Sequence, residues 1–192
     1  MIARGAKQQP AERDTPQSDA ELMLRLASGE LSALGELYDR HQVPLRNFIA
    51  RATRDAEDVD DLVHATFLAA AKSAARYDGR ASCRPWLMGI AVRHLRRRRQ
   101  TFARLMAILS ALKGTAASYR DPRPMLNART DVARALAQLS EAKRLTVLMA
   151  EVEGMSCAEI ATTLDVPIGT VWTRLHAARR ELRQALGQAG EP

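Results

Sequence analysis

The sequence predicts an all-α protein, and three observations support this prediction. Apolar residues make up 46% of the 192 residues, whereas aromatic residues make up only 4%. Alanine, leucine and arginine are abundant, and these residues favour helices because they lose little rotamer freedom there. No segment alternates apolar and polar residues for long enough to predict a strand. The apolar content is also sufficient for a packed core.

The first helices are expected after a polar N-terminal tail. Residues 1–18 contain two prolines and no apolar periodicity, so they are predicted to be disordered. Ser18 or Asp19 is suited to cap the first helix, whose apolar spacing is interrupted at Ser28-Gly29. A further helix is expected to follow Pro44.

Two longer helices are predicted next. The first runs from about Asp55 to Arg76, with an acidic first turn that suits the positive end of the helix dipole. Its apolar positions fall on one stripe, which is expected to face a core: Val59, Val63, Phe67 and Ala70. A break at 77–84 precedes Pro85, which suits the first turn of the second helix, from residue 86 to about residue 102. Trp86 is expected in the core, and arginines ring the later half of this helix.

A basic linker separates these helices from the C-terminal ones. Residues 104–128 carry two prolines and a glycine, although the apolar stretch 105–109 could either extend the preceding helix or form a short one. Helices resume near residue 130, and Gly154 is placed to end one of them. The predicted division is a tail (1–18), a helical domain (19–103), the linker (104–128), a second helical domain (129–187) and a short tail (188–192).

Residues 154–182 predict a helix-turn-helix. Ser156 and Glu159 form a capping box ahead of a short helix, and residues 165–167 form the turn. The last helix begins near Ile168. Its inward face is expected to carry Val171, Leu175, Ala178 and Leu182, and its outward face Trp172, Thr173, His176, Arg179, Arg180 and Arg183. Such a helix fits the major groove of DNA. The alternative is an ordinary helical hairpin with a solvated basic face.

Charge and composition narrow the class of function. The net charge of +7 and the isoelectric point near 10.1 favour a polyanionic partner, and the acidic patch at 55–61 suggests a second, different partner. The two cysteines and four histidines show no metal-ligand spacing. No catalytic constellation or phosphate loop is present, so neither an enzyme nor a cofactor is expected. The chain shows no signal peptide and no apolar run of membrane-spanning length, so we expect it to be cytoplasmic and not membrane-inserted.

Three motifs together resemble one family. Residues 154–161 with 166–179 are similar to the promoter-reading domain of the extracytoplasmic-function (ECF) sigma factors, in the sigma-70 family. Residues 58–68 resemble the polymerase-docking helix of that family, and 85–91 resemble its promoter-melting helix. The motifs occur in the family's order and cover most of residues 19–187.

The resemblance implies two small helical domains joined by a linker, a sigma domain 2-like bundle and a sigma domain 4-like helix-turn-helix. It implies core RNA polymerase, promoter DNA and an anti-sigma factor as partners. The implied polymerase contacts are Asp58, Asp61, Leu62 and His64. The implied contacts to the −10 element are Tyr77, Arg80, Arg84, Arg93, Arg96 and Arg97. The implied contacts to the −35 element are Ser156, Thr170, Trp172, Thr173, Arg174, His176, Arg179 and Arg180.

The chain departs from the family pattern at several of these positions. His64-Ala65 replace a usual Gln-Glu in the docking helix, and Arg93 replaces a usual Asn. Trp172 replaces a usual basic residue in the recognition helix; it cannot make an arginine-like bidentate contact to guanine, but it could pack on a thymine methyl group. Two other functions stay open on the sequence alone: a stand-alone helix-turn-helix regulator, and an adaptor that sequesters an anti-sigma protein without transcribing.

Overall fold

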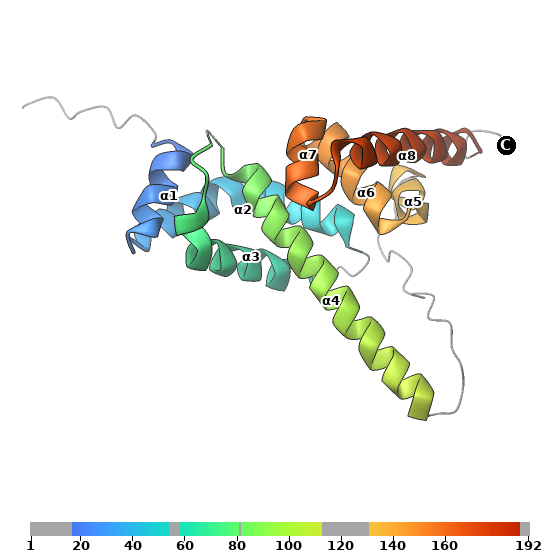
Figure 1. Cartoon of the computed structure of the whole chain (residues 1–192), viewed down its shortest axis with the longest axis horizontal. Coiled ribbons are helices and arrows are strands. Elements are labelled where there is room, and N and C mark those ends of the chain that lie inside the picture. The colour runs from blue at the N-terminus through green and yellow to red at the C-terminus, as the bar shows by residue number, and fades with distance from the viewer. Residues whose placement is uncertain (1–16, 54–57, 81, 113–130, 189–192) are drawn as a thin grey trace, which may run out of the picture.

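The computed structural model describes residues 17–53, 58–80, 82–112 and 131–188. The N-terminal helices are α1 (Asp19–Ala27), α2 (Ser32–Ala52), α3 (Val59–Ser73) and α4 (Arg84–Leu112). The C-terminal helices are α5 (Asp131–Gln138), α6 (Glu141–Val147), α7 (Cys157–Leu164) and α8 (Ile168–Gln188). Figure 1 shows the two groups side by side. These described residues contain no strand, and the all-α prediction is confirmed.

The first two helices begin and end largely as predicted. Ser18 caps α1 in a capping box with Glu21, and the chain breaks at Ser28-Gly29 before α2. The prediction that a new helix follows Pro44 is wrong, because Pro44 lies inside α2. Buried residues of α2 lie on both sides of the proline, Leu37 before it and Leu45 after it. The stabilisation from packing one continuous apolar face of α2 therefore exceeds the cost of the backbone hydrogen bond that proline cannot make.

Helix α3 presents its predicted stripe to the core, where each side chain is at most 5% exposed: Val59, Val63, Phe67 and Ala70. The predicted start near residue 55 lies outside the described residues, and the predicted end appears as a 3₁₀ turn, Ala74–Arg76. Trp86 is half-buried at the edge of the core, in edge-to-face contact with Tyr77 at 5.5 Å between ring centroids. Its aromatic body is therefore a packing element.

Helix α4 is longer than predicted. It continues to Leu112, so residues 104–112 of the predicted linker form its last turns, and the stretch 105–109 extends the helix. In Figure 1 this end of α4 projects away from the other helices. Residues 113–130, which hold the rest of the predicted linker, lie outside the described residues.

The C-terminal helices follow the predicted helix-turn-helix closely. A π-helical turn (Leu148–Val152) follows α6, and Gly154 then takes a positive φ of 66°, which glycine adopts without strain. Ser156 and Glu159 form the capping box of α7, and Asp165 takes a left-handed conformation at its C-terminal end. Helix α8 begins at Ile168.

The N-terminal and C-terminal helices share one hydrophobic core. A single cluster of buried residues runs from α1 through α4 into α6, α7 and α8, and includes Phe48, Met88, Met149 and Ile160. A smaller cluster around Leu139 closes the C-terminal group. None of the helices in the described ranges is long and apolar enough to cross a lipid bilayer.

Replacing Phe48 with alanine should destabilise the fold strongly. Phe48 is 1% exposed, so truncation leaves a cavity that costs about 3–5 kcal/mol. The matched control is Val43→Ala on the same helix, where the side chain is 61% exposed and the expected change is at most about 0.5 kcal/mol. Urea unfolding followed by circular dichroism measures both, and equal losses would show that Phe48 is not a core residue.

Candidate nucleic-acid interface

Helix α8 separates its two faces as the sequence predicts. The inward side chains Val171, Leu175 and Ala178 are at most 6% exposed, and Leu182 packs beside them. The residues of the opposite face are all exposed: Trp172, Thr173, His176, Arg179, Arg180 and Arg183. The helical spacing explains this separation, because burial of the apolar stripe on one face leaves the polar stripe on the opposite face in solvent.

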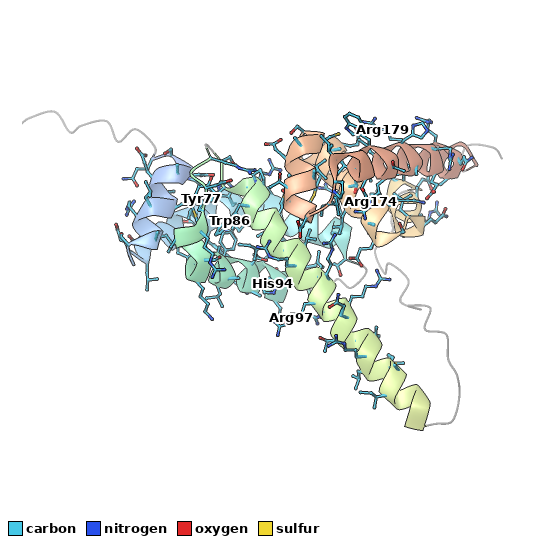
Figure 2. All side chains as sticks on the ribbon, viewed as in Figure 1. Tyr77, Trp86, His94, Arg97, Arg174 and Arg179 are labelled. Atoms are coloured by element: carbon cyan, nitrogen blue, oxygen red, sulfur yellow. The ribbon has the colours of Figure 1, made fainter. Side chains whose placement is uncertain are left out.

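The side chains of α8 differ in their burial and in their hydrogen-bond partners. The guanidinium of Arg179 donates to Glu151 through Nε at 2.8 Å and Nη2 at 2.6 Å. Arg174 is half-buried, and its Nη1 is buried without a hydrogen-bond partner. Trp172 is 60% exposed, an unusually open position for so large an apolar side chain. Figure 2 labels Arg174 and Arg179 along this helix.

Two other predicted −35 contacts have local structural roles or limited exposure. The Ser156 hydroxyl donates to the Glu159 carboxylate at 2.7 Å and accepts from its backbone N–H at 3.3 Å. The Ser156 backbone N–H also donates to the Glu159 carboxylate, at 2.8 Å. The two hydrogen bonds that the Ser156 hydroxyl and N–H donate to this carboxylate lower the pKa of Glu159, so the carboxylate stays ionised at the positive end of α7. Thr170 is half-buried in the first turn of α8.

A second basic surface lies along α4. An open hollow on this helix is lined by Arg93, Arg96, Arg97, Gln100, Thr101 and Arg104. Burial lowers the pKa of the neighbouring His94, and the charges of Arg93 and Arg97 lower it further, so His94 is neutral at pH 7. Gln100, Thr101 and Arg104 line this hollow but were not among the predicted DNA contacts; Arg104 lies beyond residue 102, where the helix was predicted to end.

Several arginines of α4 already have protein partners. Arg98 pairs with Asp58, whose side chain is 15% exposed, and Arg99 pairs with Glu141 at 2.5 Å. Arg84 pairs with Glu153 of the C-terminal group. The positive charge available on α4 is therefore less than the count of its arginines suggests.

The loop between α3 and α4 is held by its own hydrogen bonds. The Tyr77 hydroxyl donates to the carbonyl of Arg80 at 2.6 Å, and Arg80 pairs with Asp78 at 2.6 Å. Partial burial raises the pKa of Tyr77 to about 12, so the hydroxyl remains a donor at neutral pH. Tyr77 and Trp86 are labelled together at the start of α4 in Figure 2.

Asp19 anchors the far end of this loop to α1. Its Oδ2 accepts from the backbone N–H of Cys83 at 3.0 Å and lies 2.8 Å from Nε2 of His41. Burial raises the pKa of Asp19, but the hydrogen bonds from Cys83 and His41 outweigh burial and keep the pKa below its ordinary value. Asp19, His41 and Cys83 bring three potential metal ligands together, but the guanidinium of Arg40 lies 3.5 Å from Oδ1 and disfavours a cation. The cluster is better explained as a hydrogen-bonded anchor.

The acidic start of α3 forms a separate surface. Asp61 and His64 are exposed, and the imidazole of His64 stacks on Tyr38 with 6.1 Å between ring centroids. Asp58 is tied to Arg98, as described above. Leu62 is 5% exposed within the core, so its side chain is not available as a surface contact in this structure. The stripe that buries Val59 and Val63 turns Leu62 inward as well.

Three helical surfaces therefore carry most of the predicted site residues: the start of α3, the hollow of α4 and the outer face of α8. The Asp19 anchor was missed by sequence reasoning, because its backbone partner Cys83 lies 64 residues away. Together the surfaces define a helix-turn-helix protein with two basic faces and one acidic face.

Comparisons with known proteins agree with this class. Residues 37–104 match the family model for sigma-70 region 2, and residues 129–182 match that for sigma-70 region 4. CarQ, an RNA polymerase sigma factor of Myxococcus xanthus, is 33% identical over 170 residues, covering 86% of this chain and 96% of CarQ. The ECF RNA polymerase sigma factor SigL of Mycobacterium tuberculosis is 32% identical over 168 residues, covering 85% of this chain and 94% of SigL. The structure of CnrH in complex with the cytosolic domain of CnrY matches with a TM-score of 0.64 and 26% identity, and covers 91% of this chain and 100% of that one; CnrH is from Cupriavidus metallidurans.

The chain belongs to the ECF sigma factors of the sigma-70 family. Its function is that of an RNA polymerase sigma factor, which directs promoter-specific initiation of transcription. The alternative of a stand-alone regulator is not favoured, because the chain matches both a region 2 and a region 4 model.

Replacing Asp19 with asparagine should weaken the fold at neutral pH by about 1–3 kcal/mol, since buried donors lose a charged acceptor. The lowered pKa of Asp19 means that the carboxylate stabilises the fold fully above about pH 4, and that this contribution is lost as pH falls through the folded-state pKa. The stability gap between wild type and Asp19→Asn should therefore narrow below about pH 4. Thermal unfolding across pH 3–7 tests this, with the exposed Asp39→Asn as control; a constant gap would contradict the anchor.

Proposed function

We propose that three separate surfaces divide the work of the sigma factor. The exposed start of α3, with Asp61 and His64, docks on core RNA polymerase. The hollow of α4 and the loop before it engage the −10 element, and the outer face of α8 engages the −35 element. The observation that carries this proposal is the placement of an acidic surface and two arginine-bearing surfaces on three different helices.

The −35 contacts are proposed from the exposed face of α8. A single helix fits the major groove, and its first turns approach the base edges. Trp172 and Thr173 lie in these first turns, where the exposed indole is suited to pack on a thymine methyl group or a sugar. Arg179 and Arg180 lie one to two turns later and are suited to neutralise phosphates. Ser156 supports the interface by capping α7.

The −10 contacts are proposed from the loop and the hollow of α4. Arg93 and Arg97 are exposed and are suited to follow the phosphates of the strand being separated. Arg80, Arg84 and Tyr77 sit where the loop meets α4, and a flipped base costs a few kcal/mol that a shaped pocket must offset. Arg84 and Arg96 would first have to leave the protein partners they have in this structure.

The remaining proposals concern setting and regulation. We propose that the chain is not an enzyme, that it acts in the cytoplasm, and that its two predicted domains divide between the end of α4 at Leu112 and the start of α5 at Asp131. We also propose that an anti-sigma factor binds it, because the similar structure of CnrH contains the cytosolic domain of CnrY.

Reversing the charge of Asp61 should weaken binding to core RNA polymerase by at least about tenfold. Asp61 is exposed at the start of α3, so Asp61→Lys removes an attractive charge without disturbing the Asp58–Arg98 pair. The control is Asp39→Lys, an exposed acid on the neighbouring α2. Fluorescence-anisotropy titration with core enzyme, followed by transcription from genomic templates, measures both variants. Equal affinities for the two variants would move the docking surface away from α3.

Neutralising one phosphate contact should flatten the salt dependence of promoter binding. If Arg97 contacts a phosphate, Arg97→Gln should reduce the slope of log K against log salt by about one unit in the polymerase–sigma–promoter complex. Arg51→Gln is the control, because Arg51 is exposed on α2, away from the proposed DNA surfaces. An unchanged slope in Arg97→Gln places this arginine off the DNA.

A further inference from the structure

The first two turns of α8 expose a front that consists mainly of apolar groups. Trp172 is 60% exposed, and Ile168, one turn before it on the same face, is 44% exposed. None of the exposed residues in this stretch is a lysine, arginine, aspartate or glutamate: Pro167, Ile168, Gly169, Trp172, Thr173 and His176. The part of α8 that is proposed to approach the base edges therefore differs in chemistry from the arginine-bearing part that follows it.

The arginines of α8 lie behind this front or beyond it. Arg174 is half-buried, and its Nη1 is enclosed by protein. Arg179 and Arg180 follow Trp172 by about two helical turns, and Arg179 donates through two nitrogens to Glu151. An arginine reads guanine through paired hydrogen bonds to O6 and N7. The exposed residues of the first two turns have no such pair of donors, so this front is not suited to select guanine.

Local hydrogen bonding makes the front more apolar than its composition suggests. The Thr173 hydroxyl donates to the carbonyl of Gly169 at 2.9 Å, so its proton is used within the helix and its methyl group remains as an apolar contact. Gly169 is exposed, and an ideal Cβ at this position would meet nothing within 4 Å. The backbone of the first turn can therefore approach a base pair closely beside Trp172.

We propose that Trp172, with Ile168 and Thr173 beside it, reads the 5-methyl groups of thymines, and that the −35 element of this chain has a thymine beneath the indole. In the major groove, thymine presents a methyl group and a single acceptor, and apolar side chains match the methyl group. The indole N–H can donate only one hydrogen bond, so it cannot replace the paired contact of an arginine. The inference rests on the proposed assignment of α8 to the −35 element, and it names the base that this helix selects.

The size of the effect separates methyl reading from phosphate binding. Burial of one methyl group changes an affinity by roughly fourfold, the value for one buried carbon group. Arginine contacts to phosphates supply most of the affinity and make it depend on salt. Replacing Trp172 should therefore change the base preference of the promoter complex and leave the slope of log K against log salt unchanged.

Selection from a DNA library tests the base preference. The full chain with core RNA polymerase is given duplexes that are randomised upstream of a mapped transcript start, and the bound DNA is sequenced. The wild type should select thymine in at least one upstream position, and Trp172→Ala should lose that preference while neighbouring positions keep theirs. Trp172→Arg should shift the selected base toward guanine. The matched control is Leu186→Ala, which truncates an apolar side chain that is 38% exposed near the end of the same helix. Equal selection of thymine by Trp172→Ala and the wild type would overturn the proposal.

A single-atom change in the DNA tests the methyl contact itself. Deoxyuridine in place of the selected thymidine removes the methyl group and keeps the base pair and the O4 acceptor. The wild-type promoter complex should weaken by roughly fourfold, and the complex of Trp172→Ala should not change. Equal affinity of the wild type for the thymine and uracil duplexes would show that the methyl group is not read, and would overturn the proposal.

The outcomes also distinguish this proposal from the surface assignment on which it rests. If the wild-type complex selects no upstream bases, the assignment of α8 to the −35 element fails and the proposal fails with it. If upstream bases are selected but are the same for the wild type and both Trp172 variants, the proposal alone is rejected. Loss of core-polymerase binding by Trp172→Ala, with an unchanged base preference, would assign the indole to a protein contact and would also overturn the proposal.

Discussion

The burial of α4 is the constraint on which the other features depend. Its apolar residues Leu87, Ile90 and Ala91 fill the centre of the shared core, and this fixes the rotation of the helix about its axis. Once that rotation is set, Arg93 and Arg97 can only face solvent. The Tyr77–Trp86 contact and the Asp19 anchor then fix the loop that enters the helix. The burial of one face of α4 therefore fixes the orientation of the candidate −10 surface.

Local signals in the sequence predicted most of the helices and the recognition face. The Ser156–Glu159 capping box, the turn before Ile168 and the stripe of Val171 and Ala178 act within a few residues, and the structure contains each of them. The predicted start of the helix at Pro44 was wrong, because the residues that stabilise α2 through packing lie on other helices. Propensity alone does not register such partners.

Two features that the sequence did not predict depend on residues far apart in the chain. Asp19 binds the backbone of Cys83, and Arg144 binds the carbonyl of Ala52 across 92 residues. Leu62 was assigned to a surface by family resemblance, although the stripe around it is buried. A charge pattern identifies a basic helix, but it does not show which arginines already have a carboxylate or carbonyl partner.

This pairing of arginines connects the electrostatics of the chain with its shape. Arg84, Arg96 and Arg99 each contact the C-terminal half, so the packing of the two helix groups offsets part of the positive charge of α4. DNA phosphates and the protein's own acceptors compete for the same guanidinium groups. A phosphate contact to Arg84 or Arg96 therefore has to offset the loss of the contacts that these side chains make within the protein.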